Sequence, residues 1–340
     1  MREFDFIERL RSLTASRKHS TRILTGIGDD ASIISELSTR ELIVTTDLLV
    51  EGIDFHRPAT PARLLGHKAL AVSLSDIAAM GARPFWAFLS LGMPRQDWDS
   101  NFKDEFLEGF LALADHYGVT LTGGDVSETK EGIVIDSIVL GEVDKGAAIK
   151  RSGARAGDQI YVTGNLGGAA AGLKLIELGA RVSEPPALAG GPDDASIQSL
   201  LLRQLRPEPR VGWGIVLGEQ QLASVMIDLS DGLSSDLNHL CKESSAGALI
   251  NADMIPLEED VKKLCGRRAL DPLALALHGG EDFELLFTVA PEKVSRLPKK
   301  VDGVPISRIG VINDQSGVIL IREKNHEWQL QPQGYQHFKE

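Results

Sequence analysis

The stretch "PARLLGHKALAVSLSDIAAMGA", residues 61–82, decides how the first half of this 340-residue chain is interpreted. Pro61 stands where a helix typically begins and Gly81 where one typically ends, so the stretch predicts a helix. Most positions between them are apolar, yet Asp76 lies among them. Because an unpaired carboxylate is costly in apolar surroundings, Asp76 is harder to explain as a structural residue than an acid in a turn.

Strand-like and helix-like patterns alternate outward from this helix. In the first half, strands are predicted over residues 40–47, 119–125 and 132–143, and a second helix over 99–118. A new unit begins near Ala147, with a turn, a strand, a glycine turn and a helix over 151–180. Helices over 211–222 and from Leu233, and strands over 224–228 and 283–290, follow. This alternation predicts two α/β domains, residues 1–147 and 148–340.

Composition narrows the classes of ligand. With 43% hydrophobic and 25% charged residues, the chain has the make-up of an ordinary globular protein. Its net charge of −12 argues against nucleic acid and anionic membranes as partners, because both need a basic surface. Phosphate ligands are not excluded, since bound metal ions reverse the local sign of charge.

The cysteines and the apolar segments bear on the compartment. Cys241 and Cys265 show neither a disulfide framework nor zinc-ligand spacing, which predicts reduced, buried thiols. Residues 1–13 are amphipathic and contain acids, a pattern that predicts a first surface helix rather than a targeting peptide. No apolar run approaches the roughly 18 residues of a membrane span. We therefore expect a cytoplasmic protein that does not bind membranes.

Six short acidic motifs carry the chemical signal, because strand ends are where ligand sites of α/β folds collect. Their polar residues are Asp29, Asp30, Thr45, Thr46, Asp47, Asp76, Asp125, Asp228, Asp231, Glu281 and Asp282. Any one of them alone is better explained as a helix cap or a turn residue. Together they suit hard cations such as Mg²⁺, and several such ions could hold a polyphosphate against an acidic wall. This is one recurring design for phosphoryl transfer.

Other motif classes are missing. The chain has no G-x-x-x-x-G-K-[ST] loop and no kinase H-R-D or D-F-G sequence. The segment "YVTGNLGGAAAG", residues 161–172, follows a strand but lacks G-x-G-x-x-G, so tight packing of a strand on a helix is the favoured interpretation. The histidines lack metal-ligand spacing, and no pair of nucleophile and base is evident.

Seven motifs, read in order, resemble the thiamine-monophosphate kinase family. They are "GIGDDAS", "TTDLLVEGIDF", "GHKALAVSLSDIAAMGARP", "GGD", "KRSGARAGD", "IDLSDGLSSDL" and "HGGEDFELLF", which span residues 26–287, and a terminal "GYQHF" extends the match. The wider superfamily includes aminoimidazole ribonucleotide synthetases and selenophosphate synthetases. The reactive cysteine or selenocysteine of the latter, ahead of the first glycine loop, has no counterpart here.

The resemblance implies a fold and a reaction. The fold is α/β, of the α+β type, with a mixed sheet in the first domain and the site between the two domains. The reaction is Mg²⁺-dependent, in-line transfer of the ATP γ-phosphate to thiamine monophosphate, without a phosphoenzyme. It gives ADP and thiamine diphosphate, in the final step of thiamine diphosphate biosynthesis. Another ATP-dependent synthetase of the superfamily, or a non-catalytic nucleotide-binding scaffold, is the alternative. A homodimer through strands of the first domain is also implied.

The resemblance further implies roles for particular residues. Metal ligands by matched position are Asp30, Thr45, Thr46, Asp47, Asp76, Asp125, Asp228 and Asp231. The nucleotide would contact Tyr117, Gly124, Asp125, Arg151 and Ser230, and the acceptor would contact Asp54, Glu281 and Tyr335. Catalysis would rest on Asp47, Asp125 and Arg151. Arg151 has a reason of its own, because it is a fixed cation near the domain junction and suits a phosphate.

Two points stay open from the sequence alone, and one expectation concerns the first glycine motif. The family commonly has V-E-G-x-H-F where this chain has "VEGIDFH", so either Asp54 takes over the contact of that histidine or His56 does, since residues two apart on a strand share a face. In "GIGDD", we expect Gly26 and Gly28 to aim Asp30 at the metal ions while Asp29 braces the turn. The Pro- and Gly-rich residues 181–196 predict a surface loop, which either closes over the site or lies in solvent.

Overall fold

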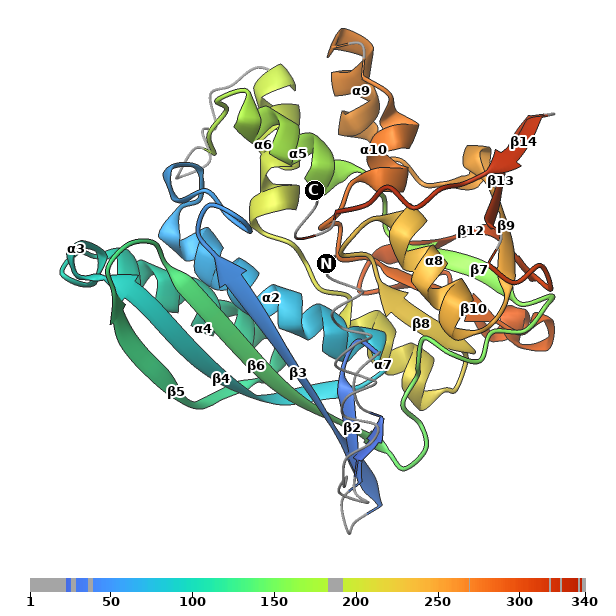
Figure 1. Ribbon diagram of the computed structural model, residues 1–340, viewed down its shortest axis with the longest axis horizontal. Coiled ribbons are helices and arrows are strands. Elements are labelled where there is room, and N and C mark those ends of the chain that lie inside the picture. The colour runs from blue at the N-terminus through green and yellow to red at the C-terminus, as the bar shows by residue number, and fades with distance from the viewer. Residues whose placement is uncertain are drawn as a thin grey trace.

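The computed structural model describes residues 23–25, 29–35, 39–182, 192–268, 270–317, 319–324, 326–335 and 337 (Figure 1). The helix expected over residues 1–13 and the turn expected at Gly26 and Gly28 lie outside these residues. The predicted α/β architecture with two domains is confirmed: the described strands form two sheets, and helices pack on each.

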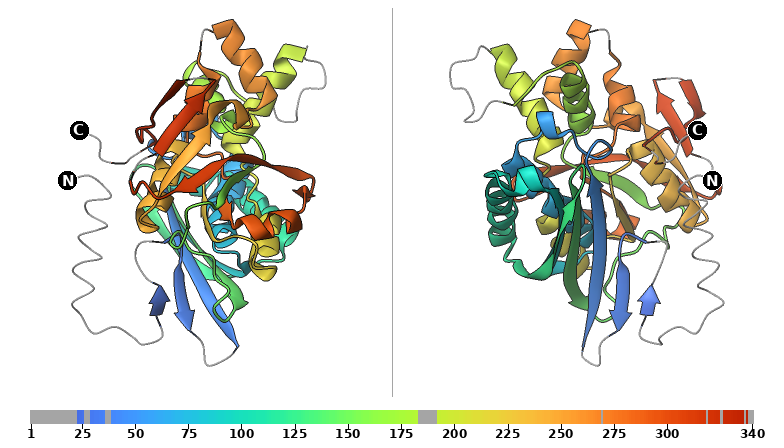
Figure 2. Two further views of the ribbon diagram at one scale, coloured as in Figure 1. Left: turned by 90° about the vertical axis from the view of Figure 1, so that its right-hand side faces the viewer. Right: turned by 60° about the vertical axis from the view of Figure 1, so that its left-hand side comes forward.

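The first sheet has six strands in the order β1-β2-β3-β6-β4-β5, and only β4 and β5 run parallel. The strands are β1 (Ile23–Thr25), β2 (Ser32–Ser35), β3 (Arg40–Val50), β4 (Arg83–Pro94), β5 (Thr120–Thr129) and β6 (Val134–Asp144). The helices of this half are η1 (Arg57–Ala59), α2 (Ala62–Ala79), α3 (Arg95–Trp98) and α4 (Phe102–Tyr117). Helix α2 packs on β3 and β6, while the views of Figure 2 show no described helix over the opposite face.

Helix α2 lies within residues 61–82, and the prediction of a helix there is confirmed. Its N-cap is Pro61, and Gly81, with φ +69°, turns the chain into β4 just beyond its end. It is buried along nearly its whole length, because the sheet, α4 and α7 (Val211–Glu219) enclose it. A Cβ on Gly66 would lie 1.8 Å from the Phe106 carbonyl oxygen, so glycine permits the close crossing of α4.

The second sheet has the order β14-β13-β9-β12-β7-β10-β8, with β11 paired to β12. Its strands are β7 (Gln159–Thr163), β8 (Val225–Asp228), β9 (Gly247–Asn251), β10 (Leu285–Val289), β11 (Lys300–Val301), β12 (Val304–Asn313), β13 (Ile319–Glu323) and β14 (His326–Gln329). The remaining helices are α5 (Gly168–Glu177), α6 (Pro192–Leu205), α8 (Leu233–Glu243), η2 (Ala252–Met254), α9 (Glu259–Arg268), α10 (Pro272–His278) and η3 (Pro291–Arg296). The predicted domain boundary, 147/148, falls in the connection between the two sheets.

The two halves are in contact mainly through α2 of the first half, against which α7 and β8 of the second half pack. A Cβ on Gly214 would lie 2.3 Å from the Ala78 carbonyl oxygen, and one on Gly218 would lie 2.4 Å from that of Gly81. Glycines therefore let the two helices touch through their backbones. This close contact fixes α2 and the strands of the second sheet relative to each other.

Two details complete the comparison with the sequence. The loop predicted over residues 181–196 is wrong for its last five residues, which belong to α6; residues 183–191 lie outside the described part of the chain. Within the described residues, no helix combines the length and the apolar character needed to cross a membrane.

Candidate functional site

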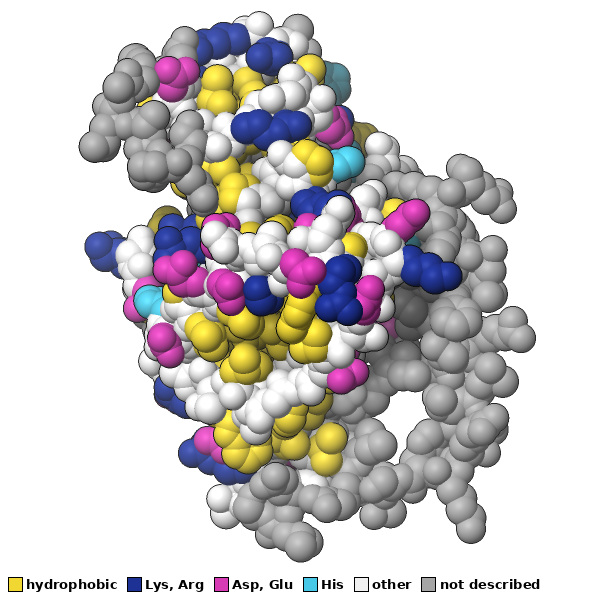
Figure 3. Space-filling model, turned by 90° about the vertical axis from the view of Figure 1, so that its left-hand side faces the viewer, with side chains coloured by type: hydrophobic (Ala, Val, Ile, Leu, Met, Phe, Trp, Pro, Cys, Tyr) yellow, Lys and Arg dark blue, Asp and Glu magenta, His cyan; other side chains and the backbone are white. Residues whose placement is uncertain are grey.

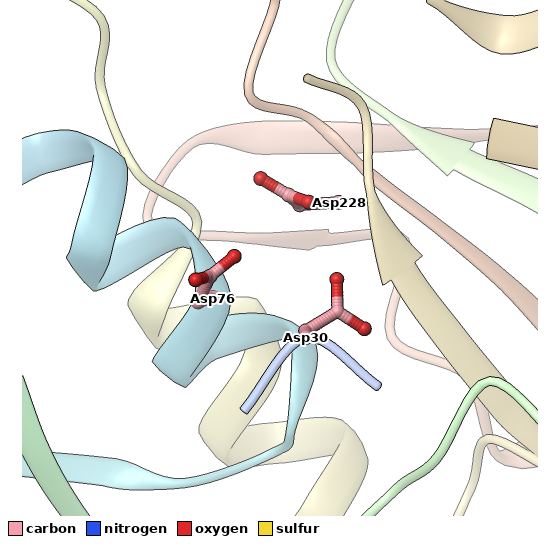
Figure 4. Close-up of side chains that lie close together, drawn as sticks. All are labelled: Asp30, Asp76 and Asp228. Carbon is pink, nitrogen blue, oxygen red and sulfur yellow. The ribbon is translucent and has the colours of Figure 1, made fainter. Parts of the chain in front are cut away.

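Three carboxylates from distant parts of the chain meet at the boundary between the halves (Figure 4). Asp30 precedes β2, Asp76 lies near the end of α2, and Asp228 ends β8. One carboxylate oxygen of each lies within 4.8 Å of the others. We call Asp30, Asp76 and Asp228 the acidic cluster. The sequence analysis predicted all three as ligands, and the structure brings them together.

Each member of the acidic cluster has one polar neighbour that holds its side chain. Arg151 donates to both oxygens of Asp30, with Nε–Oδ2 at 2.8 Å and Nη2–Oδ1 at 2.7 Å. The Thr45 hydroxyl donates to Asp76, and the Ser75 hydroxyl donates to Asp228 at 2.7 Å. These contacts orient the carboxylates, but one arginine serves three acids.

The pKa values of the acidic cluster record this shortage of positive charge. Burial and the nearby Asp30 raise the pKa of Asp228 to about 8. Burial, with Asp47 and Asp228 next in weight, raises the pKa of Asp76 well above its usual value. Carboxylates that repel one another out of water are stabilised when a cation binds between them.

Two acids flank the cluster. Asp47, on β3, accepts a hydrogen bond from the Ser73 hydroxyl at 2.8 Å, and burial above all raises its pKa to about 6. Asp29 accepts from the backbone N–H groups of Asp30 at 3.1 Å and Arg151 at 3.3 Å. Burial and Asp30 raise the pKa of Asp29 to about 7. Asp29 thus braces the turn that presents Asp30, as expected.

The donor set fits a hard cation. Carboxylates and the Thr45 hydroxyl supply oxygen only, the ligand type that Mg²⁺ prefers. Among the described residues, the acidic cluster is the one group of carboxylates, imidazoles and thiols compact enough to share an ion.

Thr46 faces away from the acidic cluster. Successive residues of a strand point to opposite faces, so Thr46 lies on the exposed face of the sheet while Thr45 and Asp47 face the site. Its hydroxyl donates to Asp136 at 2.7 Å on that exposed face. Any contact of Thr46 with an ion at the cluster would have to use its backbone carbonyl.

Asp125 also lies apart from the acidic cluster within one chain. The pairing register places Asp47 opposite Ser137, Ser137 opposite Leu89, and Leu89 opposite Gly124, which precedes Asp125 on β5. Three strand spacings of about 4.8 Å put Asp125 roughly 14 Å from Asp47. Glycine is needed at 124, because a Cβ there would lie 1.8 Å from the Leu89 carbonyl oxygen.

The turn after β8 is organised by an acid that the sequence analysis did not single out. Asp236, in the first turn of α8, accepts from the N–H groups of Asp231 at 3.2 Å and Gly232 at 3.0 Å. The Ser230 carbonyl accepts from the N–H of Glu281 at 2.8 Å. The turn that carries Ser230 and Asp231 is thereby tied to the segment that carries Glu281.

The three expected substrate residues come together in a second group. Lys68 Nζ lies 2.6 Å from Glu281 Oε1, and His337 Nε2 lies 3.9 Å from Asp54 Oδ1. The rings of Tyr335 and His337 meet edge to face, with centroids 4.9 Å apart. We call Asp54, Lys68, Glu281, Tyr335 and His337 the charged group.

The charged group adjoins the acidic cluster through the backbone. The N–H of Tyr335 donates to the Asp231 carbonyl at 3.2 Å, so the C-terminal segment lies against the turn after β8. Asp54 belongs to the charged group, whereas the exposed His56 precedes η1. The sequence analysis missed Lys68, although a lysine in an apolar helix is as informative as Asp76 in the same helix.

Tyr117 lies elsewhere. Its hydroxyl donates to the Pro209 carbonyl at 2.9 Å, and the residue lines a cavity of about 600 Å³ together with His116, Arg210 and Asp302. None of the residues lining this cavity belongs to the acidic cluster.

The glycine turn before α5 is filled by protein. The carboxylate of Asp282 accepts from the N–H groups of Gly167 at 2.7 Å and Ala169 at 3.1 Å, at the N-terminus of the helix. A Cβ on Gly172 would lie 2.1 Å from the Leu200 carbonyl oxygen. The glycines serve helix packing, and an acid occupies the position where a phosphate would bind.

Comparisons with known proteins identify the family of this chain. Residues 28–143 match the N-terminal domain of AIR synthase related proteins, and residues 155–323 match the C-terminal domain. The thiamine-monophosphate kinase of Salmonella typhimurium is 38% identical over 322 residues, which is 92% of each chain. That of Bacillus subtilis is 35% identical over 344 residues, covering both chains fully. The chain belongs to the thiamine-monophosphate kinase family.

Solved structures of this family share the whole architecture. "AaThiL complexed with AMPPCP and TMP" has a TM-score of 0.83 and 30% identity, over 99% of this chain and 97% of that one. The thiamine-monophosphate kinase of Stenotrophomonas maltophilia has a TM-score of 0.74 and 37% identity, over 95% and 97%. The two α/β domains predicted from the sequence are therefore those of the family.

Proposed function

We propose that this chain is a thiamine-monophosphate kinase, which transfers the γ-phosphate of ATP to thiamine monophosphate and releases ADP and thiamine diphosphate. The observation that carries the proposal is the acidic cluster, buried between the halves with too little positive charge of its own. Full-length relatives with this activity in their names, and a relative bound to AMPPCP and TMP, support the same reaction.

Asp30, Asp76 and Asp228 would hold Mg²⁺, with Thr45 and Asp47 completing the oxygen donors around them. The ions would neutralise phosphate oxygens and align the two substrates. We also assign Asp231 to this metal site, since its turn directly follows Asp228. Within the described part of the chain, Arg151 is the guanidinium that contacts the acidic cluster, and its side chain is 22% exposed, so it could turn toward a phosphate.

The acceptor determines what the protein has to supply. A phosphate monoester is already an anionic nucleophile at neutral pH, so no strong general base is required. The chain's residues would bind, orient and partly desolvate the two phosphates for in-line transfer, without a covalent phosphoenzyme. We assign nucleotide contacts to Arg151, Gly124, Ser230 and, through its own cavity, Tyr117.

The charged group would bind the organic part of the acceptor. Thiamine monophosphate has a cationic thiazolium and an aminopyrimidine, which suit the carboxylates of Asp54 and Glu281 and the ring of Tyr335. Only about half of Tyr335 is covered, which leaves ring surface for a ligand. The hydrogen bond from the Glu281 N–H to the Ser230 carbonyl links the charged group to the turn that follows Asp228 of the acidic cluster. Both ends of the acceptor would therefore be held.

We propose further that two copies pair through the uncovered face of the first sheet. Figure 3 shows hydrophobic side chains gathered on this side of the molecule, and Leu48 and Trp86, which the strand register places on this face, are each about half exposed or more. Asp125 lies too far from Asp47 to share an ion with it in one chain. In a pair, Asp125 could complete the site of the neighbouring copy.

Mixing two inactive variants tests this arrangement. Asp47→Asn and Asp125→Asn should each lower turnover drastically while the protein still folds. If Asp125 serves the neighbouring copy, refolding the two variants together regenerates one intact site per mixed dimer, and turnover recovers to about a quarter of the wild-type value. Equal inactivity before and after mixing would contradict the proposal that Asp125 serves the neighbouring copy. Near-wild-type turnover of either variant would exclude its assigned metal role.

The remaining assignments follow from the same picture. The domains are residues 1–147 and 148–340, with the reaction between them. The free thiols Cys241 and Cys265 and the need for ATP suit the cytoplasm.

An assay of ADP release tests the reaction itself. ATP, Mg²⁺ and thiamine monophosphate should give ADP and thiamine diphosphate in equal amounts, while free thiamine and aminoimidazole precursors should give none. ADP formed with an aminoimidazole precursor would indicate a synthetase. Binding of ATP without ADP formation from any acceptor would indicate a scaffold.

A further inference from the structure

Lys68 differs from every other lysine of the described chain in its surroundings. It lies on α2 and is 1% exposed, although lysine is almost never fully buried without a partner. Its ammonium has one ion-pair partner, Glu281, at 2.6 Å. Holding a charge out of water is costly, so a buried lysine that serves only packing is at a disadvantage against an apolar residue.

The partner of Lys68 is held from both sides. Gln204, on α6, donates to the second oxygen of Glu281, so Lys68 and Gln204 occupy one carboxylate oxygen each. The backbone of Glu281 has φ +63°, a left-handed conformation that is uncommon for any residue other than glycine. Side-chain contacts from α2 and α6 thus fix a residue whose backbone is strained, and its side chain remains 30% exposed.

The charges of the group almost cancel, but not completely. Asp54 lies near both Lys68 and Glu281, and burial above all raises the pKa of Asp54. Two carboxylates and one ammonium leave a net charge of one negative unit when His337 is neutral. A ligand with a single positive charge would complete the balance.

We propose that Lys68 is a positioning residue that sets the specificity of the acceptor site. By fixing Glu281 and cancelling one of two carboxylate charges, it prepares the charged group for a ring with a single positive charge. This inference rests on the proposed function, because it names the residue that shapes the acceptor side of the same site. Lys68 itself, being buried behind Glu281, would not touch the acceptor.

Steady-state kinetics of Lys68→Met test the positioning role. Methionine keeps the length of the side chain and removes its charge, so Glu281 loses the contact that orients it. We expect the KM for thiamine monophosphate to rise about tenfold or more, as befits a lost charged hydrogen bond. The KM for ATP should stay within about twofold, and Lys68→Arg should recover part of the loss.

Two controls separate positioning from packing. Lys174→Met removes an exposed helical lysine that pairs with Glu177, and it should leave both KM values unchanged. In a Glu281→Gln background, Lys68→Met should raise the KM for thiamine monophosphate little further, because the two residues act as one unit. Additive effects in this cycle, or equal rises of both KM values, would overturn the proposal.

A neutral analogue tests the charge match. The thiophene isostere of thiamine monophosphate has the same shape but no ring charge. Wild type should bind it about tenfold more weakly than the natural acceptor, and Glu281→Gln should narrow that ratio. Equal binding of both by wild type would overturn the charge argument. An enzyme that releases no ADP with thiamine monophosphate would instead refute the proposed function.

Discussion

Two buried groups of acids in this protein have opposite electrostatic character. In the acidic cluster, three carboxylates converge on one arginine, and the pKa of Asp228 is raised to about 8. Around Glu284, by contrast, Arg203 and Arg210 both contact one buried carboxylate, with the Thr163 hydroxyl 2.7 Å away.

The pKa of Glu284 shows what these two arginines do. Burial would raise it, yet Arg210 and Arg203 together hold it below its usual value. Burial is therefore common to both groups, and the balance of charge distinguishes them. An acid that is buried and already matched is structural, whereas buried acids without enough positive charge are prepared for a cation from solution.

The largest effect should come from removing a charge in the acidic cluster. Asp228→Asn keeps the shape of the side chain and removes one ligand charge. Because metal-ion catalysis is worth several kcal/mol, turnover should fall by about a thousandfold. Without Mg²⁺ the variant should be at least as stable as wild type, since one source of repulsion is gone. Steady-state kinetics and urea unfolding measure the two quantities.

The same kind of isosteric change at Glu284, whose charge is matched by arginines, should have the reverse outcome: a loss of stability with little loss of turnover. Glu284→Gln leaves Arg203 and Arg210 without their buried counter-charge, and losing one partner of such a network costs about 3–5 kcal/mol of unfolding free energy. Turnover per folded molecule should stay within about threefold of wild type, because Glu284 contacts protein groups and not the reacting phosphates. A variant that is stable but inactive would break the distinction drawn above.

Two neighbouring acids, Asp29 and Asp30, test the comparison within a single turn. Asp30 contributes a ligand oxygen, whereas Asp29 accepts two backbone hydrogen bonds. Asp30→Asn should lower Mg²⁺-dependent turnover about a hundredfold, and Asp29→Asn by less than about tenfold, in line with the loss of a turn contact. Equal losses in the two variants would mean that Asp29 is itself a ligand.

A further consequence is a dependence of stability on pH in metal-free protein. A carboxyl with a raised folded-state pKa stabilises the fold fully below its unfolded value of 3.8, and this stabilisation is lost as the pH rises through about 8. Wild type in chelator should therefore lose stability between about pH 5 and 8, relative to Asp228→Asn, by up to about 1.4 kcal/mol per pH unit. Parallel urea-unfolding curves at every pH would show that Asp228 ionises normally.

Sequence patterns predicted the fold because local signals and burial agree in it. Pro61 and Gly81 bound α2, and the alternating residues of β3 place Thr45 and Asp47 on the inner face. The convergence of Asp30, Asp76 and Asp228 could not be derived from local sequence patterns, because three distant segments create it. Thr46 was assigned to the metal site by its matched motif, but its position on the strand turns its hydroxyl away from that site.

Other residues could not be predicted because their roles depend on tertiary contacts. Lys68 stands out in an apolar helix, but only the fold shows that its partner is Glu281, 2.6 Å away. Asp282 and Glu284 share one motif with Glu281, yet Asp282 holds a helix N-terminus and Glu284 holds two arginines. No local pattern separates these three neighbouring acids, because their partners come from other elements.

Thermal unfolding during a titration with Mg²⁺ tests the central claim most directly. The claim is that the acidic cluster binds a cation, whereas Glu284 with Arg203 and Arg210 does not. Wild type and Glu284→Gln, from their different starting points, should both gain stability as Mg²⁺ increases, as a ligand that binds only the folded state requires. Asp228→Asn should gain much less. An equal Mg²⁺-dependent rise in Tm for Asp228→Asn and wild type would contradict the account.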